Sequence, residues 1–260
     1  MADIRPRPSG TNPEQEGSRH MTMDREALWD TYWADLPEQS GEAFWDSDPA
    51  HNAVRHLPML RPYFDPALPV MDLGCGNGTQ SPVLAEHFDR VIGVDIAQAA
   101  IDMARQTNAR PNVEYFRFDV METGEARALH ERIGDVNVYM RALFHQLPYD
   151  HRAPAVETLA ALVGKGGRVF CQEPTKVTWS VVHRLLFESD ESLPKLERLF
   201  NQFQFGLSPG QEVDTELEDL FRKTGFEIVE AGDMPMRTTE TLADGTPLDL
   251  STRYVIAHLG

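Results

Sequence analysis

Residues 70–80, VMDLGCGNGTQ, place three glycines within five positions directly after a short apolar run. Glycine loses more backbone entropy on folding than any other residue, so a cluster of glycines needs a structural reason. Close approach of the backbone to a ligand is the leading reason when such a loop follows a buried strand. The surrounding pattern indicates whether a strand precedes this loop and a helix follows it.

Short apolar runs alternate with helical patterns along the middle of the chain. Runs of β-strand length occupy residues 68–74, 90–96, 113–120, 135–143 and 167–173. Apolar residues at helical spacing fall between them, in residues 79–88, 97–107, 123–131 and 153–167. A later helical stretch precedes two closing strands at 226–232 and 251–259. This order predicts an α/β fold: a doubly wound, mostly parallel, seven-stranded sheet with helices on both faces.

Changes in composition along the chain predict how it is divided into segments. Residues 1–21 are rich in proline, glycine and charge, which is typical of a disordered lead-in. Residues 22–66 are predicted to form an N-terminal helical cap, and residues 67–260 the α/β domain. Residues 175–209 interrupt the alternation with helical and aromatic segments, and we expect them to form a lid.

The net charge of −17 argues against a nucleic-acid groove or an anionic membrane surface, which both need an excess of lysine and arginine. The two cysteines, Cys75 and Cys171, imply no disulfide framework. No apolar stretch is long enough to span a bilayer, and the N-terminus has no apolar secretory segment. We therefore expect a cytoplasmic protein that binds neither nucleic acid nor a membrane. The oligomeric state stays open, and a homodimer is compatible with the sequence.

The spacing of the glycines separates two kinds of nucleotide-binding loop. A dinucleotide fold needs a third glycine at the sixth position of the motif, where this chain has Thr79. Here Gly74, Gly76 and Gly78 instead follow Asp72 in the order acidic-x-Gly-x-Gly-x-Gly. This motif resembles that of the class I methyltransferases that depend on S-adenosylmethionine (SAM). The resemblance extends over residues 67–174 and 211–260.

The resemblance implies a Rossmann-like class I methyltransferase fold and SAM as the cofactor. Asp95 ends the second strand in VIGVDIA and would bind the ribose, whereas Asp119 ends the third in FRFDV and would bind the adenine. Asp72 would orient the ammonium group. Taken alone, each aspartate could equally cap a helix. The residues implied to bind the cofactor are Asp72, Gly74, Cys75, Gly76, Gly78, Asp95, Ile96, Asp119, Val120 and Arg141.

The end of the fourth strand carries information about the acceptor. Methylases of DNA amino groups resemble one another in an Asn/Asp-Pro-Pro-aromatic turn there, but this chain reads MRALFHQLP. The arrangement resembles small-molecule methyltransferases, including those of natural-product pathways. His145 is the candidate general base, because imidazole suits proton transfer near neutral pH. Glu173, at the end of the fifth strand, is expected to face the same crevice. A helix-start histidine and a capping or ion-paired glutamate are the alternatives.

Aromatic and histidine side chains are candidates for contacts with the acceptor. Tyr32, Trp33, His145, Trp179 and His183 are the predicted substrate residues. A wider set could close over an apolar substrate or pack in the core: Tyr32, Trp33, Trp45, Trp179, Phe187, Phe203 and Phe205. No residues have the spacing of metal ligands, so we expect no metal.

The sequence thus predicts a SAM-dependent methyltransferase that acts on an O-, N- or C-nucleophile of a small organic acceptor, in secondary metabolism. The first alternative is a SAM-binding protein that does not methylate, either a sensor or a SAM-assisted cyclase or isomerase. The second is a nicotinamide dehydrogenase, which Thr79 disfavours. The identity of the acceptor and the need for a base remain open.

Overall fold

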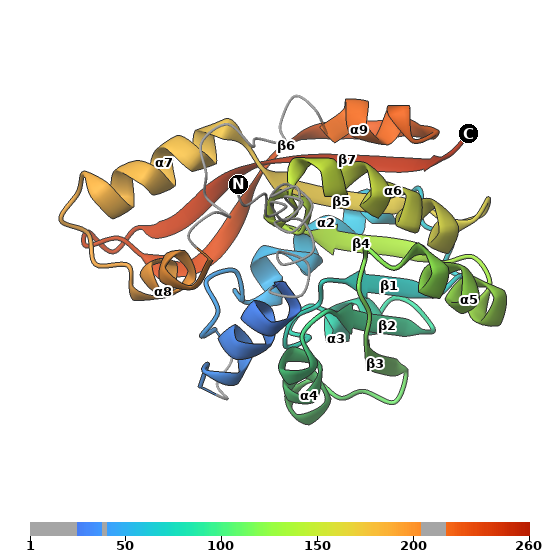
Figure 1. Ribbon diagram of the computed structural model, residues 1–260, viewed down its shortest axis with the longest axis horizontal. Coiled ribbons are helices and arrows are strands. Elements are labelled where there is room, and N and C mark those ends of the chain that lie inside the picture. Colours follow the sequence, from blue (N-terminus) through green and yellow to red (C-terminus); the bar gives the residue numbers. More distant parts are fainter. Residues whose placement is uncertain (1–24, 38–40, 204–216) are drawn as a thin grey trace, which may run out of the picture.

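The computed structural model describes residues 25–37, 41–203 and 217–260. These residues form a seven-stranded sheet in the order β3-β2-β1-β4-β5-β7-β6 (Figure 1). The first five strands are parallel, and β7 runs antiparallel to both β5 and β6. The predicted doubly wound, mostly parallel sheet is confirmed. The strands are β1 (Val70–Leu73), β2 (Val91–Asp95), β3 (Val113–Arg117), β4 (Asn137–Arg141), β5 (Val169–Pro174), β6 (Phe226–Thr241) and β7 (Pro247–Leu259).

Helices cover both faces of the sheet. One face packs against α5 (Thr123–Ile133), α6 (Tyr149–Val163) and α9 (Leu217–Lys223). The other face packs against α2 (Ala53–Leu60), α3 (Ser81–Ala85) and α4 (Gln98–Thr107). Two short 3₁₀ helices, η1 (Pro49–His51) and η2 (Phe144–Gln146), lie in connecting segments, and residues 25–34 form a further helix. The predicted helical cap before β1 is therefore only partly helical.

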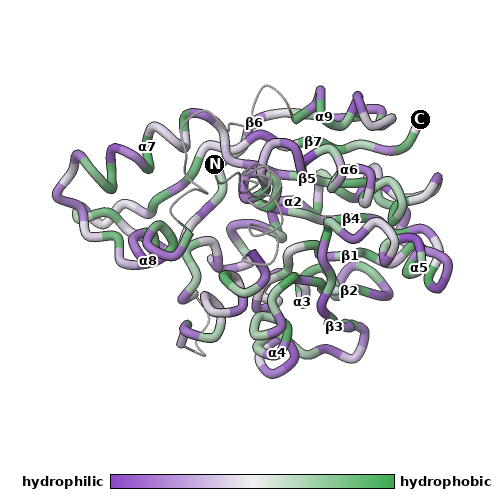
Figure 2. The backbone as a smooth tube through the Cα atoms, in the orientation of Figure 1, coloured by the Kyte–Doolittle hydropathy of each residue, from purple (hydrophilic) through white to green (hydrophobic). Residues whose placement is uncertain are grey.

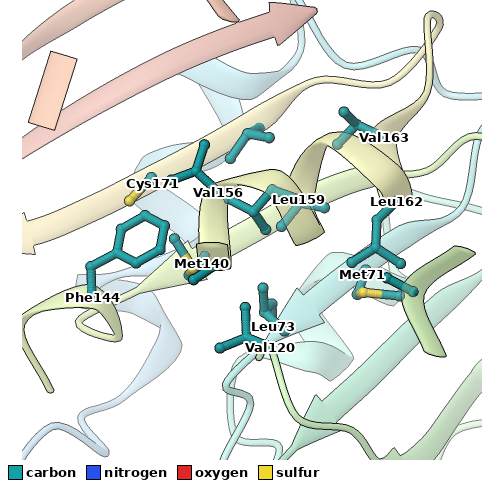
Figure 3. Close-up of a cluster of buried hydrophobic side chains, with 14 of the residues drawn as sticks. Met71, Leu73, Val120, Met140, Phe144, Val156, Leu159, Leu162, Val163 and Cys171 are labelled. Atoms are coloured by element: carbon teal, nitrogen blue, oxygen red, sulfur yellow. The ribbon is translucent and has the colours of Figure 1, made fainter. Parts of the chain in front are cut away.

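The core follows from the apolar runs of the central strands. β1, the first four residues of β2 and β4, and all of β5 are buried, as expected for parallel strands with helices on both faces. Figure 3 shows Val156, Leu159, Leu162 and Val163 of α6 lying over Met71 and its neighbours in the sheet. The helical face predicted for residues 153–167 is confirmed, because its five apolar residues, Ala155, Val156, Leu159, Leu162 and Val163, are fully buried.

The two closing strands are much longer than the sequence predicted. β6 and β7 stay paired as far as Thr241 and Pro247, and Gly245 turns between them with a φ of 86°. The hairpin runs past the parallel strands to meet α7 (Lys176–Phe187) and α8 (Pro194–Phe203) (Figure 1). This extension buries only one row of side chains, so its apolar residues are sparse and alternate with polar ones.

Hydropathy separates the sheet from this extension. Figure 2 shows hydrophobic colouring along the central strands, whereas α7 and α8 are mixed. The predicted lid at residues 175–209 contains α7 and α8, joined by the non-helical residues 188–193. Residues 204–209 lie outside the described residues, as does the predicted lead-in at 1–21. No helix in the described ranges is long and apolar enough to cross a membrane.

Candidate active site: a pocket at the glycine loop

A pocket opens at the carboxyl ends of β1, β2 and β4. β1 lies between β2 and β4, so the strand order reverses here, which is where open α/β sheets bind ligands. The structure brings together all the predicted cofactor residues except Gly78, which does not line the pocket. Those in its wall are Asp72, Gly74, Cys75, Gly76, Asp95, Ile96, Asp119, Val120 and Arg141.

The glycine loop has a backbone that side chains rarely adopt. Gly74, Gly76 and Gly78 all have positive φ, at 73°, 54° and 76°. A Cβ atom on Gly76 would also lie 2.5 Å from the ring of Trp33. Glycine is needed here for both the conformation and the close approach. Burial raises the pKa of the Cys75 thiol well above its usual value, so this cysteine is not poised as a nucleophile.

Asp95 joins the glycine loop to the start of α4. Its Oδ2 accepts from the amide of Gly76 at 2.9 Å, and its Oδ1 accepts from the amide of Ala97 at 3.0 Å. Burial raises the pKa of Asp95, while these amides oppose the shift. Asp95 therefore accepts a hydrogen bond at the start of α4, as a helix-capping residue does, and its carboxylate also lines the pocket.

Two opposite charges in the pocket wall, Asp72 and Arg141, form no ion pair in the described part of the chain. Asp72 is only 5% exposed and accepts one hydrogen bond, from the Ser81 hydroxyl at 2.6 Å. The Nη1 atom of Arg141 is buried and has no hydrogen-bond partner within the described ranges. A buried charge without a partner is costly, so a ligand that carries both a cation and an anion would be stabilised here. The zwitterionic methionine arm of SAM has this pattern.

Burial raises the pKa of Asp72 to about 6, with Ser81 and Arg141 opposing the shift. The folded chain holds this proton more tightly than the unfolded chain, so stability falls as the pH rises from about 4 to 6. A shift of this size lowers the free energy of unfolding by about 2–3 kcal/mol above pH 6.

Asp72→Asn is therefore expected to raise the Tm of the ligand-free protein at pH 7.5 by a few degrees. It should also weaken S-adenosylhomocysteine (SAH) binding, because the ammonium group loses its counter-ion.

Differential scanning fluorimetry across pH checks this expectation. The difference in Tm between Asp72→Asn and the wild type should shrink as the pH approaches 4. Equal Tm values at every pH would contradict a buried, destabilising carboxylate at this position.

The helix at residues 25–34 supplies a wall of the pocket, of which the sequence predicted Trp33 but not Arg25 or Trp29. Arg25, Trp29 and Trp33 line the pocket, and their spacing of four residues places them on one helical face. That spacing was the signal available in the sequence. Arg25 donates to Asp119 Oδ1 at 2.6 Å, and Asp30 accepts from the amide of Ala99 near the start of α4 at 2.8 Å.

Asp119 lies two residues beyond the end of β3, not within the strand as predicted. Its Oδ1 accepts from both Arg25 and the amide of Met121. The two bonds leave Oδ2 without a hydrogen bond from the described residues. Arg117, the last residue of β3, forms an ion pair with Glu26 on the same N-terminal helix. The helix is thus held against the adenine end of the predicted cofactor site.

His145 and Glu173 form a pair beside the pocket. His145 Nδ1 lies 2.9 Å from Glu173 Oε2, and the ring also packs against Trp179. Glu173 is fully buried and accepts from the backbone amides of Leu143, Phe144 and His145. The expectation that Glu173 faces the crevice is therefore wrong: its oxygens hold η2 and the imidazole. Neither residue is part of the pocket wall, which Leu143 and Gln146 supply in this segment.

Other predicted substrate residues lie away from the pocket. The His183 side chain is 54% exposed and pairs with Glu188 on the outer side of α7. Tyr32 is buried behind Trp45, with the two rings stacked, and Trp179 packs against His145. Of the five predicted substrate residues only Trp33 lines the pocket, and Trp45 of the wider aromatic set lines it too. No group of three side chains in the described ranges could hold a metal ion.

The sheet order, the glycine loop and the acidic strand ends define an α/β protein with a nucleoside-binding pocket at its strand switch point. Residues 45–231 match a family described as "Methyltransferase domain". The crystal structure of a SAM-dependent methyltransferase from Anabaena variabilis ATCC 29413 matches with a TM-score of 0.82. It is 28% identical and covers 90% of this chain and 95% of that chain.

Two curated relatives match over shorter regions. N-demethylindolmycin N-methyltransferase of Streptomyces griseus is 34% identical over 82 residues, which is 31% of this chain and 35% of that protein. Trans-aconitate 2-methyltransferase of Azoarcus sp. (strain BH72) is 32% identical over 145 residues, or 55% and 53% of the two chains. The chain therefore spans only about a third to a half of these relatives' lengths.

The match to the methyltransferase family covers well over half of the chain, so the chain belongs to this family, among the class I SAM-dependent methyltransferases. SAM is the cofactor of that class. The buried Asp72 carboxylate, the Arg141 guanidinium and the cradle around Gly76 fit its methionine arm.

Proposed function

We propose that this protein transfers a methyl group from SAM to a small organic acceptor. The observation that carries the proposal is the coincidence, in one pocket, of a glycine cradle with the buried Asp72 carboxylate and with Arg141, whose Nη1 has no hydrogen-bond partner among the described residues. Bound SAM supplies an electrophilic methyl group on its sulfonium. Asp95 would hold the ribose hydroxyls, and Asp119 Oδ2 the adenine amino group. Arg141 would hold the methionine carboxylate and Asp72 the ammonium.

We further propose that His145 is the general base and that Glu173 positions it. The buried carboxylate is an acceptor, so the proton between the two side chains belongs on Nδ1 of the imidazole. This leaves Nε2 free to accept a proton from the acceptor. The backbone amides on Glu173 fix the carboxylate, and the carboxylate in turn fixes the orientation of the ring.

The wall formed by residues 25–34 would exclude water from the cofactor, which favours displacement at the methyl group. The relatives that act on N-demethylindolmycin and trans-aconitate support a small-molecule acceptor. We propose a place in secondary metabolism, and the similarity to the N-demethylindolmycin N-methyltransferase of Streptomyces griseus supports it. Mass spectrometry of reactions with SAM and candidate acceptors tests the proposal. A gain of one methyl group together with SAH is expected, and a rearranged product of unchanged mass would instead indicate SAM-assisted isomerisation.

Trp33→Ala is expected to weaken SAH binding about tenfold, because it removes a buried aromatic wall over the glycine loop. Isothermal titration calorimetry measures the effect. Phe187→Ala is the matched control, since this aromatic side chain is exposed and lies outside the pocket. Equal losses in the two variants would remove the N-terminal helix from the cofactor site.

A further inference from the structure

Asp46 is a buried carboxylate in the pocket wall that the cofactor assignment leaves unused. It is 4% exposed and lies in the segment before η1. Its Oδ2 accepts from the amide of Gly41 at 2.8 Å and from the side chain of Asn77 at 2.7 Å. The side chain of Thr79 and the positive charge of Arg141 also stabilise the carboxylate, but within the described ranges Asp46 forms no ion pair. Such a carboxylate is stabilised by a cation in the pocket.

The charges around the pocket also favour an additional cation. Its wall carries four carboxylates and two guanidinium groups, Arg25 and Arg141, so carboxylates are in excess. Arg25 is already paired with Asp119. In the proposed cofactor site, Arg141 takes the carboxylate of the methionine arm and Asp72 takes the ammonium. Asp46 is then left without a positive partner.

Three of the four tryptophans of the chain surround the same space. Trp29, Trp33 and Trp45 line the pocket together with Asp46. The ring centroids of Trp29 and Trp45 are 5.6 Å apart, and those of Trp33 and Trp45 are 6.0 Å apart. Indole faces attract organic cations, and an adjacent carboxylate adds to this attraction.

We infer that Asp46 and the tryptophan wall of Trp29, Trp33 and Trp45 form an acceptor subsite that selects an organic ammonium group, so the methyl acceptor is an amine. Before transfer the ammonium gives one proton to His145, the base of the proposed function. The nitrogen lone pair then forms the new C–N bond as the bond between the methyl group and sulfur breaks and SAH is released. The inference rests on the proposed function and narrows its acceptor class. Asp46 receives the ammonium, and the indole rings cover the adjoining apolar part of the molecule. Burial raises the pKa of the Asp46 carboxyl, which a bound cation would oppose.

Calorimetry with a matched set of probes tests the inference. Tryptamine, tryptophol and indole-3-propionate share one ring and differ in the end group: ammonium, hydroxyl or carboxylate. Each is titrated into the wild-type protein saturated with SAH. Tryptamine is expected to bind at least tenfold more tightly than the other two, because hydrogen bonds to charged groups are stronger than neutral ones.

The variant Asp46→Asn separates acceptor binding from cofactor binding. Its amide oxygen can still accept from Gly41 and Asn77, so the local fold is retained. Tryptamine affinity should fall about tenfold or more, while tryptophol and SAH affinities stay within about twofold of the wild type. Asp48→Asn is the matched control, because Asp48 is exposed and only caps η1. It should leave all affinities unchanged.

Three results would overturn the inference. Equal binding of the three probes would remove the cation selectivity. Preference for indole-3-propionate would indicate that Arg141 binds an anionic acceptor. A loss of SAH affinity in Asp46→Asn as large as the loss for tryptamine would assign Asp46 to the cofactor. Failure of the wild-type protein to bind SAH would instead contradict the proposed function, which keeps the two outcomes distinct.

Discussion

His145→Ala is expected to lower kcat by about 10²–10⁴-fold, the usual contribution of a general base. The imidazole is held by Glu173 beside the pocket, and its removal leaves no other histidine near η2 in the described ranges that is fixed in this way. SAH affinity should stay within about twofold of the wild type, because His145 does not line the cofactor pocket. Steady-state kinetics with the acceptor found by product analysis, together with calorimetry, measure both quantities.

Two further variants make this test specific. His183→Ala removes an exposed histidine and should leave kcat unchanged. Glu173→Gln should lower kcat with little change in SAH affinity, since the amide cannot hold the imidazole in the same way. A folded His145→Ala protein with normal turnover would rule out the base and leave proximity as the main catalytic effect.

Asp95→Ala is expected to weaken SAH binding about ten- to a hundredfold or more. The substitution removes a charge-assisted bond to the ribose and also the acceptor that holds the amides of Gly76 and Ala97. Both losses act on the same pocket. Calorimetry measures the change, and Asp102→Ala on the exposed side of α4 is the matched control.

Unchanged SAH affinity in a folded Asp95→Ala protein would contradict the ribose assignment. A large loss in Asp102→Ala would indicate a general effect of charge on α4 rather than a specific contact.

The sheet and the glycine loop could be predicted because their signals are local. Apolar runs marked the five parallel strands, and the spacing of Gly74, Gly76 and Gly78 marked the loop after the first of them. Asp95 follows from the same logic, because it ends a strand next to that loop. Each of these features depends on residues close together in the chain.

The remaining parts of the site depend on contacts between distant residues. Arg25 and Asp119 are 94 positions apart, and Asp46 reaches Asn77 across 31 positions. The prediction that His183 contacts the substrate was wrong, because the sequence does not show which side of α7 faces the pocket. Trp179 and Val182 form the buried side of that helix, and the next residue points outward. The periodicity of apolar residues predicts which side of a helix is buried, but not which element that side packs against.

The length of β6 and β7 also could not be predicted from the local sequence pattern. Asp244–Gly245 marks a hairpin turn, but the strands around it are polar because they pack on one side only. The pairing is fixed by α7 and α8, which bury Met236, Leu248 and Leu250. Tertiary packing thus extends a hairpin that the strand pattern alone ends early.

A crystal structure of the protein with SAH tests the central claim most directly. We expect the ribose at Asp95, the adenine between Asp119 and Val120, and the methionine carboxylate at Arg141. The sulfur should then face the open part of the pocket beside Trp45. SAH bound outside this pocket, or bound with its carboxylate away from Arg141, would contradict the account.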